Sequence, residues 1–192
     1  MATTRSTQYD LRGFGHVALV CNDMQATVDF YEGILGFKLV KTLELGSQGQ
    51  HFFFEVTEND GIAFFWFKNV NAAAPGVAGA DWFAGESTPS SARGLMSKAA
   101  VGAMHHLSFG VPADKLAEYR QRLVEAGVEV SDIIEHSDEA GDRITGFYFR
   151  DPDGIVLEFS AWNDISAGSQ DIRPATAAES ASRRRDGVPI TV

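Results

Sequence analysis

Apolar runs and polar breaks along the first third of the chain predict a strand, a helix and three further strands. The run from Phe14 to Val20 is rich in β-forming residues. Asp23 suits the N-cap of a helix that continues to about Leu35, and Gly36 suits its end. The strands expected next cover residues 37–45, 50–57 and 62–68, and a tight turn at Asn59-Asp60-Gly61 joins the last two.

The second half of the chain repeats this order. After a strand expected over residues 104–111, a helix opens at Asp114, continues to about Ala126 and ends at Gly127. Further strands are expected over residues 128–134, 144–150 and 155–161, with a turn at Asp151-Pro152-Asp153-Gly154 between the last two. The pattern therefore predicts an α+β fold made of tandem βαβββ modules.

The two halves align through landmarks that lie about 90 residues apart. His16 aligns with His106, and Gly36 aligns with Gly127. Further on, Asp60-Gly61-Ile62 aligns with Asp153-Gly154-Ile155, and this register makes Phe65 the counterpart of Glu158. The repeat divides the chain into the segments that follow. They are a polar arm (1–10), module one (11–69), a connecting loop (70–103), module two (104–162) and a polar C-terminal tail (163–192).

Composition and charge exclude several classes of protein. The formal net charge of −10 argues against general nucleic-acid binding, which needs a basic face. Cys21 is the single cysteine, so an intrachain disulfide is excluded and a reducing, cytoplasmic setting is expected. No apolar segment approaches the roughly 18 residues of a membrane span, and the N-terminus lacks the apolar stretch of a secretory signal. We expect neither a nucleic acid nor a membrane as partner.

Because side chains alternate between the two faces of a strand, equivalent positions in the two modules are expected on equivalent faces of their sheets. Four such positions hold His16, Phe65, His106 and Glu158. Glu158 interrupts an apolar run, where a carboxylate without a partner would be costly. Two imidazoles and one carboxylate favour non-haem Fe(II) and leave open positions, although Zn²⁺ or Mn²⁺ also suits them. Because adjacent strand residues face opposite ways, only one of His105 and His106 is expected to reach the metal, and the repeat selects His106. An ordinary core role is the competing interpretation.

These residues resemble the vicinal oxygen chelate superfamily, which includes glyoxalase I, fosfomycin-resistance transferases, bleomycin-binding proteins and type I extradiol dioxygenases. The resemblance covers roughly residues 11–162 and is carried by residues 15–19, 106–109 and 147–158. It implies a cupped mixed sheet around one metal site, with His16, His106 and Glu158 as the ligands. Members often associate, so a homo-oligomer is expected.

Within the superfamily, the segment before Glu158 is most similar to that of extradiol dioxygenases, because Tyr148 precedes it across an Asp-Pro-x-Gly turn. The resemblance implies that Tyr148 hydrogen-bonds substrate oxygen or dioxygen, and a core tyrosine is the alternative. The acid/base histidine of those enzymes has no counterpart at its usual place. His51 is the candidate substitute for moving protons, against a structural role in its strand.

Aromatic residues could line the pocket of such a site. Phe53, Phe65 and Phe67 would do so if their strands keep strict alternation, and Trp82 in the connecting loop could close it. That lining suits a flat, partly apolar substrate, although core packing is an equally ordinary role for phenylalanine. A loop as long as residues 70–103 is typical of a lid, a binding element or a flexible linker.

The leading hypothesis is an Fe(II)-dependent, extradiol-type dioxygenase. It would chelate a small, catechol-like aromatic substrate through vicinal oxygens and cleave the ring with dioxygen. A glyoxalase-like isomerase or lyase that uses Zn²⁺, Ni²⁺ or Mn²⁺ is the first alternative. The second is a non-catalytic protein that sequesters a small aromatic compound.

Overall fold

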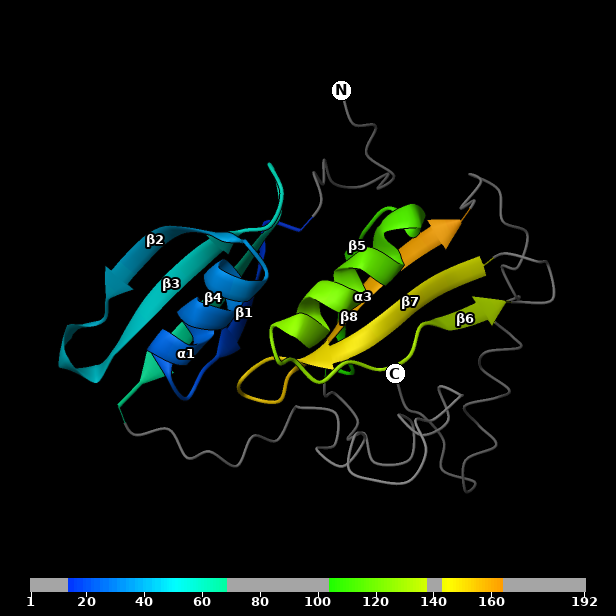
Figure 1. The fold of residues 1–192 in the computed structure, drawn as a ribbon. Helices are drawn as coiled ribbons and strands as arrows, with labels where there is room; N and C mark the ends of the chain where they lie inside the picture. The colour runs from blue at the N-terminus through cyan, green and yellow to red at the C-terminus, as the bar shows by residue number, and fades with distance from the viewer. Residues whose placement is uncertain (1–13, 69–103, 138–142, 164–192) are drawn as a thin grey trace, which may run out of the picture.

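The computed structural model describes residues 14–68, 104–137 and 143–163, which form two four-stranded sheets (Figure 1). The expected polar arm, the connecting loop with Trp82, and the tail beyond Asn163 lie outside the described residues. No helix in the described part of the chain is long and apolar enough to cross a membrane.

Module one has the predicted order of elements. Its strand order is β1-β4-β3-β2, in which β1 runs parallel to β4 and the other neighbours are antiparallel. The elements are β1 (His16–Val20), α1 (Met24–Val28), the π-helix η1 (Asp29–Ile34), β2 (Lys38–Glu44), the 3-10 helix η2 (Gly46–Gln48), β3 (Gly49–Glu55) and β4 (Gly61–Phe67).

Module two repeats this topology, with strand order β5-β8-β7-β6. Its elements are β5 (Leu107–Gly110), the 3-10 helix η4 (Ala113–Lys115), α3 (Leu116–Glu125), β6 (Ile134–Ser137), β7 (Arg143–Arg150) and β8 (Val156–Asn163). The predicted α+β class and the tandem βαβββ order are therefore confirmed. Within the described residues the two sheets remain separate, because no strand pairing joins them.

The helices begin in different ways in the two modules. Asp23 caps α1 as predicted, since its Oδ1 accepts hydrogen bonds from the backbone N–H groups of Gln25 (2.9 Å) and Ala26 (3.0 Å). In module two, the helix expected to open at Asp114 begins one residue earlier as a 3-10 helix, and α3 itself begins at Leu116. Pro112, with φ fixed at −61°, starts the 3-10 helix η4 that contains Asp114, and α3 begins only after it.

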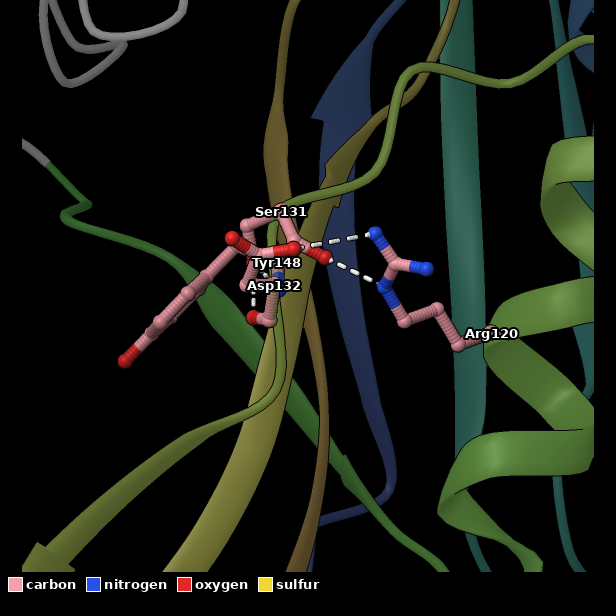
Figure 2. A network of polar contacts seen from close by, with 4 residues as sticks. All are labelled: Arg120, Ser131, Asp132 and Tyr148. Atoms are coloured by element: carbon pink, nitrogen blue, oxygen red, sulfur yellow. Dashed lines mark hydrogen bonds and ion pairs between the residues drawn. The ribbon is translucent and has the colours of Figure 1, made fainter. Parts of the chain in front are cut away.

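The strand expected over residues 128–134 is also wrong, because β6 begins only at Ile134. Before it, pairing with β7 is limited to an isolated bridge. Figure 2 shows the reason: Arg120 reaches from α3 and donates from Nε to the carbonyl of Ser131 (2.7 Å). The Ser131 hydroxyl accepts the backbone N–H of Tyr148 (2.9 Å). These side-chain hydrogen bonds accompany a backbone hydrogen bond from the N–H of Ser131 to the carbonyl of Tyr148 (2.9 Å).

Strand pairing corrects the alignment of the two modules. Ala18, two residues after His16, pairs with Ala63 of β4. Ser108, two residues after His106, pairs with Glu158 of β8. The counterpart of Glu158 is therefore Ala63 and not Phe65. The similar Asp-Gly sequences misled the register because they occupy different positions in the two hairpin turns. The error is two residues, so the predicted face of the strand is still correct.

One aromatic core joins the two modules on the sides of the sheets that carry the helices. Phe30 contacts Phe149 of the other module, with ring centroids 6.5 Å apart, and Phe37 contacts Phe109 at 5.2 Å. The largest fully buried side chains, which come from both modules, are Tyr31, Phe52, Phe54, Phe64, Phe147 and Phe149. Alternate residues point to opposite sides of a strand. The second face of each sheet, termed the open face below, combines the exposed side chains of His16, Val20 and Ser108 with the buried side chains of His51, Tyr148 and Glu158.

Two polar contacts cross the boundary between the modules. The hydroxyl of Tyr31 donates to Asp151 Oδ2 (3.1 Å), and the backbone N–H of Asn22 donates to Asp153 Oδ1 (3.0 Å). Asp151 Oδ1 also accepts the backbone N–H groups of Asp153 (2.9 Å) and Ile155 (2.8 Å). Burial raises the pKa of Asp151 to about 6, and the neighbouring Asp153 carboxylate adds to this.

The raised pKa of Asp151 predicts a pH-dependent effect of Asp151→Asn on stability. The folded state binds the proton more tightly than the unfolded chain, so ionised Asp151 lowers the free energy of unfolding as the pH rises from about 4 to about 6. The variant lacks this charge. Its free energy of unfolding, relative to wild type, should therefore rise over that range by at most about 3 kcal/mol and then level off.

Urea unfolding at several pH values from 4 to 8 measures this difference. The exposed Asp114 provides the matched control, because Asp114→Asn removes a carboxylate from the surface. A constant difference between wild type and Asp151→Asn over this range would contradict the prediction.

Candidate functional site

Glu158 is at the centre of a polar cluster on the open face of module two. It lies in β8, where strand pairing puts Ser108 of β5 on one side and Tyr148 of β7 on the other. Directly paired residues of neighbouring strands point to the same side of a sheet. Figure 2 shows the Tyr148 ring pointing away from α3, toward this open face. Glu158 is nevertheless only 5% exposed.

Three neighbours stabilise the carboxylate of Glu158. His106 Nε2 lies 3.2 Å from Glu158 Oε2, and the hydroxyls of Ser108 and Tyr148 also hydrogen-bond to this side chain. Burial alone would raise the pKa of Glu158, but these hydrogen bonds hold it below its ordinary value. Burial and the Glu158 charge raise the pKa of Tyr148, so its hydroxyl keeps its proton. The cluster therefore presents an ionised carboxylate beside an imidazole nitrogen.

A glycine makes room for this carboxylate. A Cβ atom at Gly146 in β7 would lie 2.7 Å from the carbonyl oxygen of Phe159, 3.0 Å from Glu158 Oε1 and 3.2 Å from Ser160 Cβ. On the same face, Ser160 and Ser108 share a hydrogen bond of 2.8 Å between their hydroxyls. The sequence interpretation missed Gly146, Ser108 and Ser160. Ser160 follows Glu158 by two residues in β8, so strand parity with Glu158 was the signal that could have found it.

The rings of His105 and His106 touch, with their Nδ1 atoms 2.6 Å apart. The expectation that these two side chains face opposite ways is therefore wrong. Alternation does not apply to them because β5 begins only at Leu107. Burial and the neighbouring His106 ring lower the pKa of His105.

The open face of module one is aromatic. The ring of His51 stacks on Phe65, with centroids 3.6 Å apart and planes 3° from parallel, and it also contacts Phe53 at 4.2 Å. Phe53 in turn contacts His16 at 5.5 Å, and Phe65 stacks on Phe67 at 5.5 Å. The three phenylalanines predicted to line a pocket thus lie on the face of His16. Their contact with substrate stays a prediction, as does that of Trp82.

The side chain of His51 is 8% exposed, and a backbone carbonyl determines which of its ring nitrogens carries a hydrogen. His51 Nδ1 lies 2.9 Å from the carbonyl oxygen of Phe64. A carbonyl only accepts hydrogen bonds, so Nδ1 carries a hydrogen, and in the neutral tautomer with this hydrogen the lone pair is on Nε2. That arrangement suits a group that accepts a proton or binds a metal through Nε2.

The structure does not bring the predicted ligand triad together within one chain. Among the described residues, no three His, Cys, Asp or Glu side chains form a group that could hold a metal ion. His106 and Glu158 meet in module two, whereas His16 is exposed on β1 against Phe53. The predicted ligands therefore lie in two separate places, His106 with Glu158 in module two and His16 in module one. The imidazole nitrogen of His106 and the ionised carboxylate of Glu158 are donors that suit a divalent transition metal, but these two side chains do not by themselves make up the predicted set of three.

The family model of the Glyoxalase/Bleomycin resistance protein/Dioxygenase superfamily matches residues 13–159. The chain belongs to this superfamily, which confirms the resemblance seen in its motifs. Members typically bind divalent metal ions, in agreement with the donor set. A search of curated proteins finds no match.

Solved structures share the fold at low sequence identity. A glyoxalase family protein from Enterococcus faecalis is 22% identical, with a TM-score of 0.54, and the match covers 78% of this chain and 97% of that one. A glyoxylase/bleomycin resistance protein/dioxygenase domain from a Frankia species is 19% identical, with a TM-score of 0.55 and coverage of 80% and 99%. The fosfomycin resistance protein FosX from Listeria monocytogenes is 17% identical, with a TM-score of 0.52 and coverage of 81% and 96%. These identities establish the fold alone.

The close contacts around Gly146 predict that Gly146→Ala disturbs Glu158. The added methyl group meets backbone and the Glu158 carboxylate, so we expect a loss of about 1–3 kcal/mol in the free energy of unfolding. Gly110→Ala is the control, because Gly110 lies on the same open face and a methyl group added there would meet nothing within 4 Å. Urea unfolding compares the two, and equal stability of both variants would contradict the prediction.

Proposed function

We propose that this protein is a metal-dependent enzyme whose site forms between two copies of the chain. His16 of one copy completes the ligand set begun by His106 and Glu158 of the other. The observation that carries the proposal is the contact of His106 Nε2 with Glu158 Oε2 at 3.2 Å on an open sheet face, with His16 on a second open face. Two-fold pairing would unite each half-site with its complement and create two equivalent sites.

Exposed apolar side chains on the same two faces support this pairing. Val20 is 47% exposed on the face of His16, and Phe67, stacked on Phe65, also lies there. Trp162 follows Glu158 in β8 by an even number of residues, so it shares the open face of module two, and it is 56% exposed. Large apolar side chains gathered around half-sites are typical of surfaces that another molecule covers. A second copy of the chain supplies both the cover and the missing ligand.

The finer proposal is an extradiol-type dioxygenase that takes a catechol-like substrate, with Fe(II) as the metal. A bound divalent ion supplies a Lewis acid that holds two vicinal oxygens. The chain contributes the other functions. The aromatic face of Phe53 and Phe65 suits stacking of a flat ring, His51 Nε2 can accept the proton of a substrate hydroxyl, and the protonated Tyr148 hydroxyl can donate a hydrogen bond to substrate oxygen.

Metal content and oxygen uptake test the reaction. After anaerobic reconstitution with Fe(II), the protein should consume dioxygen with at least one member of a catechol panel and form a ring-opened product. Tight binding of Zn²⁺, Ni²⁺ or Mn²⁺ without uptake would instead support a glyoxalase-like isomerase or lyase. Retention of an aromatic compound without any bound metal would support a non-catalytic binding protein.

Mixing inactive variants tests the shared site. His16→Ala and Glu158→Ala should each abolish cation binding, because each removes a ligand from both sites of a pair. Refolding the two variants together should restore about a quarter of wild-type binding and activity, since half of the pairs are mixed and each mixed pair has one intact site.

The matched control mixes His106→Ala with Glu158→Ala, which damage the same half-site. This mixture should restore nothing, because every site then lacks one ligand. Cation binding that survives in His16→Ala, or equal behaviour of the two mixtures, would overturn the shared site.

A further inference from the structure

We propose that Ser131 is a positioning residue that sets where the Tyr148 ring lies beside Glu158, and that helix α3 holds Ser131 in place. Tyr148 is 5% exposed, and its hydroxyl hydrogen-bonds to the Glu158 side chain. Its ring meets the His106 ring edge-on, with centroids 5.5 Å apart and planes at 77°. The inference rests on the proposed function only for the task of the Tyr148 hydroxyl, because the placement of the ring involves no cation.

The pairing of β7 with the segment before β6 shifts by one residue close to Tyr148. Ile134 of β6 pairs with Gly146. Val130 lies four residues earlier, yet it pairs with Phe149, which is only three residues beyond Gly146. One extra residue on one side of a strand pair is typical of a β-bulge, and bulges beside active sites commonly redirect a side chain or end the pairing.

Ser131 binds both backbone polar groups of Tyr148 at this irregularity. The N–H of Tyr148 donates to the Ser131 hydroxyl (2.9 Å), and the N–H of Ser131 donates to the carbonyl of Tyr148 (2.9 Å). The Ser131 hydroxyl donates its own hydrogen to the carbonyl of Asp132 (2.8 Å). Ser131 is only 4% exposed. Removing its hydroxyl would take this acceptor from the Tyr148 N–H at a buried place, so the strand would have to move to find another.

Arg120 holds Ser131 from the side of the helix. Its Nε donates to the carbonyl of Ser131 (2.7 Å), and its Nη2 lies 3.3 Å from Asp132 Oδ1. Figure 2 shows the guanidinium reaching this network from α3 on one side, with the Tyr148 ring leaving on the other. The Asp132 side chain is 74% exposed, so its ion pair contributes little, and the bond to the Ser131 carbonyl makes the link. A continuous path therefore connects α3 to the backbone of Tyr148.

The position of this backbone matters because Tyr148 and Glu158 are directly paired residues of β7 and β8. Paired residues point to the same side of a sheet, and here that side is the open face. A hydrogen bond weakens steeply away from its preferred geometry, so a shift of the Tyr148 backbone would separate the hydroxyl from the carboxylate. Displacing a group at a reaction site by about 1 Å can lower a rate by about 100-fold.

The first test follows the Tyr148 ring in the metal-free, full-length protein. Nuclear Overhauser contacts between the ring protons of Tyr148 and His106 should be present in wild type and lost in Ser131→Ala. Ser131→Thr keeps the hydroxyl and should retain them. The rings of Tyr31 and Phe64, whose centroids lie 4.8 Å apart in the aromatic core, provide the control for folding, and their contact should persist in every variant.

A second pair of variants tests the link to α3 without changing the buried serine. Arg120→Met removes the hydrogen-bond donors but keeps an apolar side chain, and it should weaken the contact of Tyr148 with His106. Arg122→Met is the matched control, because Arg122 lies on the same helix and pairs with Glu118 at the surface. This control should leave the contact unchanged.

A double-mutant cycle distinguishes positioning from general damage to the fold. In Fe(II)-loaded protein with catechol, Ser131→Ala should lower kcat for oxygen uptake by about 10- to 100-fold. In the Tyr148→Phe background the same substitution should change kcat by less than about two-fold, because the hydroxyl through which Ser131 acts is already absent.

The outcomes separate this inference from the proposed function. The positioning role is overturned if Ser131→Ala keeps the contact of Tyr148 with His106, if Ser131→Thr loses it as well, if Arg120→Met behaves like Arg122→Met, or if kcat falls equally in the two backgrounds. If wild type consumes no dioxygen with any catechol, the proposed function fails, and the ring contacts still decide whether Ser131 positions Tyr148.

Discussion

The candidate site depends on keeping the carboxylate of Glu158 ionised where it is almost wholly buried. An isolated carboxylate at such a place would become protonated, because removal from water penalises the charged form. His106, Ser108 and Tyr148 reverse that tendency by hydrogen bonding to it. Gly146 leaves the space that the carboxylate occupies. The same surroundings that preserve the charge also aim it at the imidazole of His106, so the electrostatics and the geometry of the half-site have one cause.

In the proposed function, the packing of the two modules is the reason that a single chain would hold only halves of a site. Their aromatic core forms on the helix-bearing sides, where Phe30 reaches Phe149 and Tyr31 reaches Asp151. The ligand-bearing sides therefore face away from this core. Each open face then combines ligands with exposed apolar side chains, an arrangement that association of two copies would cover. Strand alternation therefore has two consequences: alternate side chains form the core, and the side chains between them point to the face that a second copy would cover.

The duplicated modules have diverged in chemistry while keeping one backbone plan. Ser108 and Glu158 in module two occupy the positions of Ala18 and Ala63 in module one, and Tyr148 occupies that of Phe53. One open face is therefore polar and binds a cation in our proposal, and the other is aromatic with His51 among its rings. Such a division suits a site between two copies, where a ligand-rich face meets an apolar one.

The sequence by itself determined the order of elements, the duplication and the strand faces of His16, Phe53, Phe65 and Glu158, because these follow from local patterns of period two and from helix-ending glycines. Register was less certain: the Asp-Gly turns pointed to Phe65, and only strand pairing identified Ala63. Tertiary structure alone decided that His105 touches His106, that Arg120 and Ser131 replace a strand, and that His16 is separated from its expected partners. The first of these features depends on β5 beginning only at Leu107, and the others depend on contacts between separate elements. Local preferences carry no information about either.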